Sequence, residues 1–238
     1  SESVLSQNRE SLSSVIKNSS SYDLILCADD EIIDECPNAV LFPYGSTWLN
    51  RGKIKHPDGL GYFDPTVETF KKKDRNINDV SFLVSWYDTD REGYGVRKEI
   101  WSRQEEIEIP IMFHTSRKSF LSAPNPLPTG EKEDLFYSMA HICVENQSVK
   151  HYFTEKLIDS FLTYTIPVYW GWPNIGSYFH KEGMIIFNTV DELIPQLNSL
   201  TMDEYYDKME FIDKNRKIAE SYANFGERIA SIVQGVVT

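Results

Sequence analysis

From Val80 to Trp86 the chain is almost continuously apolar (VSFLVSW), a pattern that few structures other than a fully buried β-strand accommodate. A strand of a parallel sheet has this composition because helices cover the sheet on both faces. Similar short apolar runs alternate with amphipathic segments along the chain. This alternation predicts an α/β fold with a doubly wound parallel sheet, in which ligands bind beyond the carboxyl ends of the strands.

Hydrophobic periodicity gives the expected position of each element. Up to Phe42 the chain predicts the order helix, strand, helix, strand. The expected strands are residues 22–28, 39–42, 80–86, 110–113, 141–145, 166–170 and 184–187. The expected helices include residues 4–18, 96–107, 135–140 and 155–163, and further helices follow residue 187.

Between Asn50 and Asn78 the composition becomes polar, with proline, glycine and the charged run KKKDR. A stretch of this kind is typical of a linker between two units of structure. We therefore expect a first unit, together with the linker, in residues 1–75 and a second unit in residues 76–238.

The formal net charge of −12 argues against nucleic acid or an anionic membrane as a partner, because either one needs a basic face. A small anionic ligand stays compatible with this charge, since a few local cations and a helix amino terminus can hold a phosphate. Cys27, Cys36 and Cys143 have neither metal-binding spacing nor the even number of a disulfide framework. We expect them to be buried thiols of a protein in a reducing compartment.

No apolar run reaches the length of a membrane span, and the polar start SESVLSQNRESLSS is unlike a signal peptide. We expect a chain in the cytoplasm or at the cytoplasmic face of a membrane, without a span of its own. Because the chain begins with Ser rather than Met, we also expect that residues upstream are missing.

Polar residues follow the expected strand 141–145, where the chain turns toward a helix that starts near Thr154. The periodicity of this helix places Glu155, Lys156 and Asp159 off its core side, near its positive end. Backbone N–H groups, the helix dipole and Lys156 together make a phosphate site, and Glu155 is placed to accept from a ribose hydroxyl. The same Glu–Lys pair also fits an ordinary solvated face of a helix.

The wider sequence around this helix favours the phosphate site. The string E-N-x-x-x-x-x-Y-x-T-E-K-L from Glu145, followed by T-I-P-V-Y-W-G up to Gly171, resembles the signature of the family 10 glycosyltransferases, the fucosyltransferases. Residues 22–49 resemble the closing strands of that family's acceptor domain, and residues 80–101 resemble the start of its donor domain. The resemblance covers most of residues 20–220.

This resemblance implies a GT-B fold of two Rossmann-like domains, with a shortened amino-terminal acceptor domain in residues 1–75 and the donor domain in residues 76–238. It implies an inverting transferase that moves L-fucose from GDP-fucose to a glycan hydroxyl. The nucleotide sugar is then a substrate, and neither a cofactor nor a metal is required. By similarity, the diphosphate contacts Asn146, Tyr152 and Lys156, the ribose contacts Glu155, and Arg97 reaches the phosphates from the facing loop.

The general base of the family is a carboxylate shortly before the segment that matches YDLILC. Glu2, in the sequence SES, resembles that position, although an exposed glutamate at a chain end is the ordinary alternative. Glu10 is the other carboxylate nearby.

Three alternatives stay open at this point. Asp88-Thr89-Asp90 follows a strand, as does the metal-binding D-x-D of GT-A glycosyltransferases. Another donor, such as UDP-xylose, is compatible with changes at pocket residues such as Tyr169, Trp170 and Trp172. A chain without a general base would be a nucleotide-sugar-binding module that transfers nothing.

Overall fold

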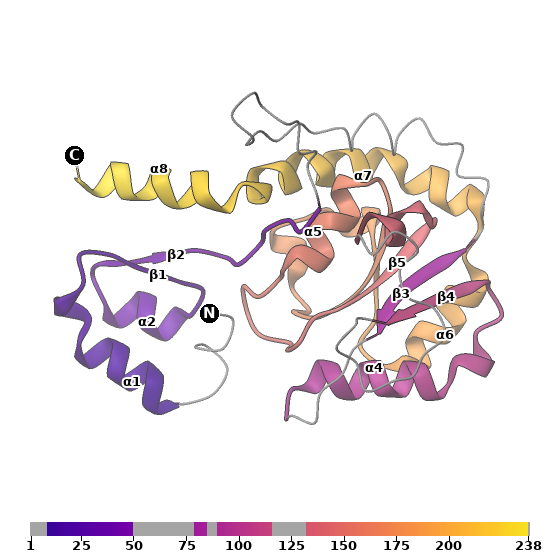
Figure 1. Ribbon diagram of the computed structural model, residues 1–238, viewed down its shortest axis with the longest axis horizontal. Coiled ribbons are helices and arrows are strands. Elements are labelled where there is room, and N and C mark those ends of the chain that lie inside the picture. Colours follow the sequence, from indigo (N-terminus) through magenta and orange to yellow (C-terminus); the bar gives the residue numbers. More distant parts are fainter. Residues whose placement is uncertain (1–8, 50–78, 85–89, 116–131, 238) are drawn as a thin grey trace.

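The structure is a computed structural model that describes residues 9–49, 79–84, 90–115 and 132–237. A small amino-terminal unit lies beside a larger unit built around a sheet (Figure 1). The linker expected between Asn50 and Asn78, and with it the boundary between the two expected domains, lies outside the described residues.

The amino-terminal unit has the predicted order of helix, strand, helix and strand. Its two strands pair in parallel, and Asp29 caps the second helix by accepting from the backbone N–H groups of Glu31 and Ile32. Cys27 and Cys36 are free thiols buried in the small core between these elements. The elements are α1 (Arg9–Lys17), β1 (Ile25–Cys27), α2 (Asp30–Glu35) and β2 (Ala39–Leu41).

The larger unit contains a five-stranded, fully parallel sheet in the order β4-β3-β5-β6-β7. This confirms the predicted doubly wound α/β sheet. The strands are β3 (Val80–Val84), β4 (Ile111–Thr115), β5 (Ala140–Val144), β6 (Ile166–Trp170) and β7 (Ile185–Ile186).

Helices cover both faces of this sheet (Figure 1). Alternate residues of β6 face opposite cores: Val168 packs in the core with α4 and α6, whereas Tyr169 packs in the core with α5. A short 3₁₀ helix, Lys132–Tyr137, takes the place of the helix expected at 135–140. The α-helices of this unit are α4 (Glu92–Ser102), α5 (Glu155–Leu162), α6 (Val190–Ser199) and α7 (Met202–Ala223).

The order of the strands fixes where a ligand can bind. The chain passes from β3 outward to β4 and then returns to the other side of β3 to form β5, β6 and β7. The direction in which successive strands are added to the sheet therefore reverses between β3 and β5. In open α/β sheets the crevice for ligands lies at the carboxyl ends of the two strands at such a point.

The last helix, α8 (Phe225–Val237), crosses back from the larger unit to the amino-terminal unit (Figure 1). Arg228 donates to the carbonyl oxygens of Gly45, at 2.7 Å, and Pro43, at 2.9 Å. The rings of Phe225 and Phe42 meet edge to face with centroids 5.2 Å apart. Within the described ranges, no helix has the combined length and apolar character that a membrane crossing needs.

The start of α4 differs from the sequence expectation. The helix begins at Glu92 rather than near Val96, so Arg97 lies in its second turn instead of at its first residues. The sequence does not predict a helix start at Glu92, because Gly93 and Gly95 follow it and glycine has a low helix propensity. Position 93 needs a glycine because the backbone of Glu145 lies close to it: an added Cβ would lie 1.8 Å from the carbonyl oxygen of Glu145.

Gly93→Ala should lower the free energy of unfolding by about 2–4 kcal/mol, because a methyl group has no room against the Glu145 backbone. Urea unfolding followed by circular dichroism measures the change. Gly95→Ala is the matched control, since an added Cβ there meets nothing within 4 Å. The control should be stabilised by about 0.5–1 kcal/mol, and equal midpoints for the two variants would contradict the close approach.

Candidate functional site

The first turns of α4 meet the loop that follows β5, at the reversal of the sheet's winding. The backbone N–H of Gly93 donates to the carbonyl oxygen of Asn146 at 3.1 Å. Arg97 is only 3% exposed, and its Nη2 donates to the carbonyl oxygen of Val144 and, at 2.9 Å, to Oδ1 of Asn146. Arg97 therefore fixes the side chain of Asn146 at the end of β5.

Glu145 joins the end of β5 to the start of α5. Its carboxylate is fully buried and accepts from the backbone N–H and the hydroxyl of Thr154, each at 2.8 Å. Thr154 in turn caps α5 by accepting from the N–H of Lys156. Burial raises the pKa of Glu145, while the Lys156 ammonium, 3.7 Å away, opposes that rise.

Glu155 and Lys156 form an ion pair in the first turn of α5, with 3.1 Å between Oε1 and Nζ. Burial opposes ionisation of Glu155, but Lys156 and Lys132 outweigh it and bring its pKa down to about 2. Burial likewise disfavours the charged form of Lys156, yet Glu155 and Glu145 raise its pKa. Both side chains are therefore ionised at neutral pH.

The face of α5 that carries Asp159 is covered by a distant segment. The hydroxyl of Thr47 donates to Asp159 at 2.6 Å, and the backbone N–H of Trp48 donates to the same carboxylate at 3.2 Å. Lys132 adds an ion pair of 2.8 Å. Glu155 and Asp159 are both buried, and these long-range contacts cover Asp159, so the alternative of an ordinary solvated helix face is wrong for these two residues.

A cavity of about 560 Å³ opens between the amino-terminal unit and the start of α5. Its wall on the sheet side includes Asn146, Tyr152 and Glu155. Its opposite wall includes Asp29 and Tyr44. The centroids of the Tyr44 and Tyr152 rings lie 6.2 Å apart. The cavity is thus at the position where the order of the strands predicts a ligand.

Among the described residues, two cations line the cavity besides the residues expected from the sequence. These are Arg91, at the start of α4, and Lys150, in the loop before α5. Lys150 forms an ion pair with Asp30 of α2 and lowers the pKa of Asp30. The Nε2 atom of His151 lies 3.2 Å from the same carboxylate. These contacts connect the amino-terminal unit to the larger unit at the edge of the cavity.

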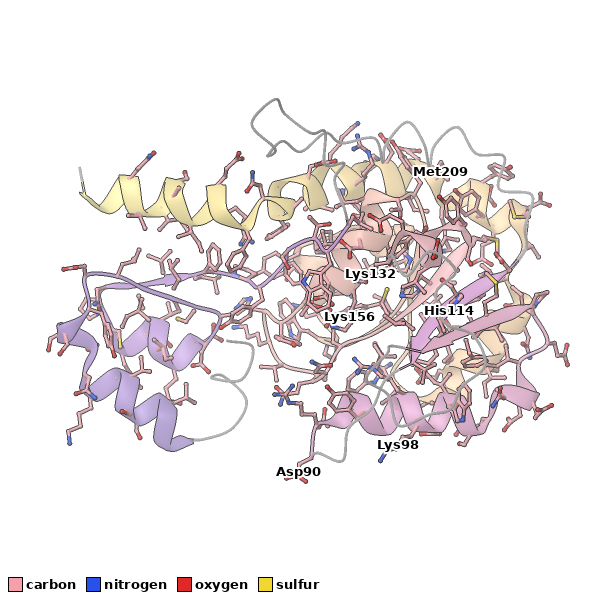
Figure 2. The ribbon with its side chains drawn as sticks, in the orientation of Figure 1. Asp90, Lys98, His114, Lys132, Lys156 and Met209 are labelled. Carbon is pink, nitrogen blue, oxygen red and sulfur yellow. The ribbon has the colours of Figure 1, made fainter. Side chains whose placement is uncertain are left out.

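The residues predicted from the sequence are brought together in two layers. Asn146, Tyr152 and Glu155 line the cavity, whereas Arg97 and Lys156 lie directly behind that wall. Figure 2 shows Lys156 near Lys132, beside α5. The side chain of Lys156 keeps 22% of its surface exposed. Glu2 lies outside the described residues.

The alternative metal motif is only partly described. Asp88 and Thr89 lie outside the described residues, and Asp90 is an exposed residue just before α4. In the described ranges, His, Cys, Asp and Glu side chains form no group of three or more that could hold a metal ion.

Comparison with known sequences gives a short match. No family model matches the chain. A stretch of 63 residues is 35% identical to the α-(1,3)-fucosyltransferase FucT of Helicobacter pylori, and it spans 25% of this chain and 13% of that protein. The sequence similarity is therefore fucosyltransferase-like over a quarter of the chain.

Comparison with solved structures covers more of the chain. A crystal structure of an α1,3-fucosyltransferase has a TM-score of 0.55 at 19% identity, over 79% of this chain and 60% of its own. A crystal structure of an α1,3-fucosyltransferase with GDP-fucose has a TM-score of 0.54 at 19% identity, over 79% of this chain and 61% of its own. The crystal structure of TarM has a TM-score of 0.51 at 11% identity, over 98% of this chain and 47% of its own. These likenesses confirm the predicted α/β fold of GT-B type.

Several residues of the site were missed by the sequence analysis. Lys132 follows a proline-rich stretch, and Trp48 follows the irregular segment PYGST, so neither belongs to a recognisable local pattern. Both meet α5 through contacts between residues far apart in the chain, as the Lys132–Asp159 and Trp48–Asp159 pairs show. Asp29 follows the expected strand 22–28 and precedes the expected helix, but nothing in the sequence predicted that it lines a cavity.

Arg97→Lys should lower the free energy of unfolding by about 1–3 kcal/mol, because an ammonium cannot reproduce the guanidinium contacts with Val144 and Asn146. Chemical denaturation measures the change. Arg103→Lys, at the carboxyl-terminal cap of the same helix, is the control: its ion pairs lie at the surface, and the expected change is within about 0.5 kcal/mol. Indistinguishable transitions for the two variants would show that Arg97 does not hold the loop.

Proposed function

We propose that this chain supplies the donor site of a glycosyltransferase, which moves a sugar from a nucleoside diphosphate to a hydroxyl of a glycan acceptor. The donor that we favour is GDP-fucose, with transfer of L-fucose and inversion at its anomeric carbon. The nucleotide sugar is a substrate in this proposal, and no metal or other cofactor takes part.

The cavity at the reversal of the sheet carries this proposal. It lies beside the amino terminus of α5, where backbone N–H groups and the helix dipole favour an anion. Support also comes from the 63-residue similarity to a fucosyltransferase and from the likeness to structures solved with GDP-fucose and with GDP. The GDP complex has a TM-score of 0.53 at 17% identity, over 86% of this chain and 69% of its own.

In the proposed complex, Asn146 and Tyr152 contact the diphosphate from the cavity wall. Lys156 reaches a phosphate through its exposed part, and Arg97 acts mainly by orienting Asn146 and adding positive charge behind it. Glu155 accepts from a ribose hydroxyl. Its low pKa suits this role, because an ionised carboxylate is a strong hydrogen-bond acceptor.

The chemistry of a departing nucleoside diphosphate explains why cations are needed here. Negative charge grows on the leaving phosphate as the bond to the sugar breaks. Fixed donors and cations in a site closed to water stabilise this charge without reorganising. Arg97 and Lys156 are held in place by Asn146 and Glu155, so they meet this requirement in the proposal.

The acceptor hydroxyl must lose a proton as it attacks the anomeric carbon from the face opposite the diphosphate. A carboxylate placed on the acceptor side takes this proton as a general base. We propose Glu2 for this role, on its resemblance to the family position.

Isothermal titration calorimetry with GDP and UDP tests the donor site. We expect GDP to bind, with the same affinity in EDTA and in Mn²⁺. Lys156→Ala should weaken GDP binding by about 10-fold, because a charge-assisted contact with a phosphate is lost. Lys214→Ala, which removes a surface cation paired with Glu210 on α7, should leave the affinity unchanged.

Other outcomes of this titration select an alternative. Binding that disappears in EDTA and returns with Mn²⁺ would favour the Asp88-Thr89-Asp90 motif. Tighter binding of UDP than of GDP would favour another donor, such as UDP-xylose. Equal GDP affinity in the wild type and Lys156→Ala would remove Lys156 from the site.

A transfer assay with GDP-fucose and a panel of glycan acceptors tests the general base. Glu2→Gln should reduce transfer by about 100-fold or more, with GDP affinity unchanged, because the amide keeps the shape but cannot take the proton. Full activity of the variant would eliminate Glu2. GDP binding without transfer by the wild-type chain would favour a binding module.

A further inference from the structure

We propose that the indole of Trp48 is the stacking surface for the base of the nucleotide and that it selects a purine. This inference rests on the donor site proposed above and names a chemical class of ligand for it. Trp48 lines the cavity and is 62% exposed. An exposed tryptophan on a cavity wall leaves a large apolar surface in water, and a flat ligand would cover it.

The support beneath this side chain is rigid. The backbone N–H of Trp48 donates to the carboxylate of Asp159 at 3.2 Å, and the preceding Thr47 hydroxyl donates to it at 2.6 Å. The following residue, Leu49, is buried and donates its N–H to the Thr47 hydroxyl at 3.2 Å. Because these contacts fix the backbone on both sides of Trp48, ligand binding there costs little backbone entropy.

Lys132 gives this ring an electrostatic character. Its ammonium lies 5.1 Å from the centroid of the Trp48 ring and 2.8 Å from the Asp159 carboxylate. A cation over an aromatic face is attracted by the negative quadrupole of the ring and draws electron density toward itself. An indole polarised in this way stacks best on an electron-rich partner. Purines have more π-electrons and more ring area than pyrimidines, so stacking on this polarised indole favours a purine.

The position of Trp48 along α5 matches the dimensions of a nucleotide. Glu155, which we assign to the ribose, and Asp159, which anchors Trp48, are four residues apart, about 6 Å along the helix axis. Lys132 bridges the two, because its ammonium also lies 3.8 Å from Glu155. A nucleotide with its diphosphate toward Asn146 and its ribose at Glu155 therefore carries its base toward Trp48.

Calorimetry with GDP and UDP on three variants tests this inference. Trp48→Ala should weaken GDP binding between about 5-fold and 150-fold, the range observed for loss of one base–aromatic stack, and UDP binding by less than about 3-fold. Trp48→Phe keeps an aromatic surface and should stay within about 3-fold of the wild type for GDP. Tyr206→Ala removes an exposed aromatic residue on α7, outside the cavity lining, and should change neither affinity.

Fluorescence gives a second measurement that does not depend on the stability of Trp48→Ala. Stacking of GDP on Trp48 should quench part of the tryptophan emission of the wild type, and Trp48→Phe should lose that quenching while it still binds GDP. Unchanged GDP affinity in Trp48→Ala would overturn the inference and leave the donor site standing. An equal loss for GDP and UDP would overturn the selection of purines, and failure of the wild type to bind any nucleotide would overturn the inference and the proposed function together.

Discussion

The carboxylate of Glu145 has no exposed surface, and it accepts two hydrogen bonds of 2.8 Å from Thr154. Two glycines allow the neighbouring elements to close around it: a Cβ on Gly93 would strike its carbonyl oxygen, and a Cβ on Gly171 would lie 3.1 Å from its Cγ. The starts of α4 and α5 and the ends of β5 and β6 therefore meet at one residue. A buried carboxylate without these donors would cost several kcal/mol, so this arrangement of elements is strongly determined.

The site is locally balanced in charge, although the whole chain carries a net charge of −12. Three buried or half-buried cations face three buried carboxylates around α5. They are Arg97, Lys132 and Lys156 on one side and Glu145, Glu155 and Asp159 on the other. Burial already raises the pKa of Glu145 and of Asp159, and an anion in the cavity would raise both further. Local pairing thus removes the repulsion that the buried carboxylates would otherwise exert on a small anionic ligand.

The sequence predicted the elements far better than their surroundings. Strand β6 has the predicted bounds, because a buried strand carries its signal in its own residues. The alternative of a solvated face on α5 was wrong because Thr47 and Lys132, distant along the chain, cover Asp159. Motif similarity brought together Asn146, Tyr152 and Glu155, which line one cavity. The opposite wall could not be predicted, since it depends on how the two units pack and no local pattern records that packing.

The crossing of α8 has a mechanical consequence for the cavity. The amino-terminal unit is joined to the larger unit through the segment 42–49 and again through Asn224, where α7 gives way to α8. Arg228 ties these two crossings to each other by hydrogen bonds with Pro43 and Gly45. A body held mainly along one line turns most easily about that line. Rotation about this line would break the surface contacts of Asp30 with Lys150 and His151 and change the separation of Asp29 and Asn146, which lie on opposite walls.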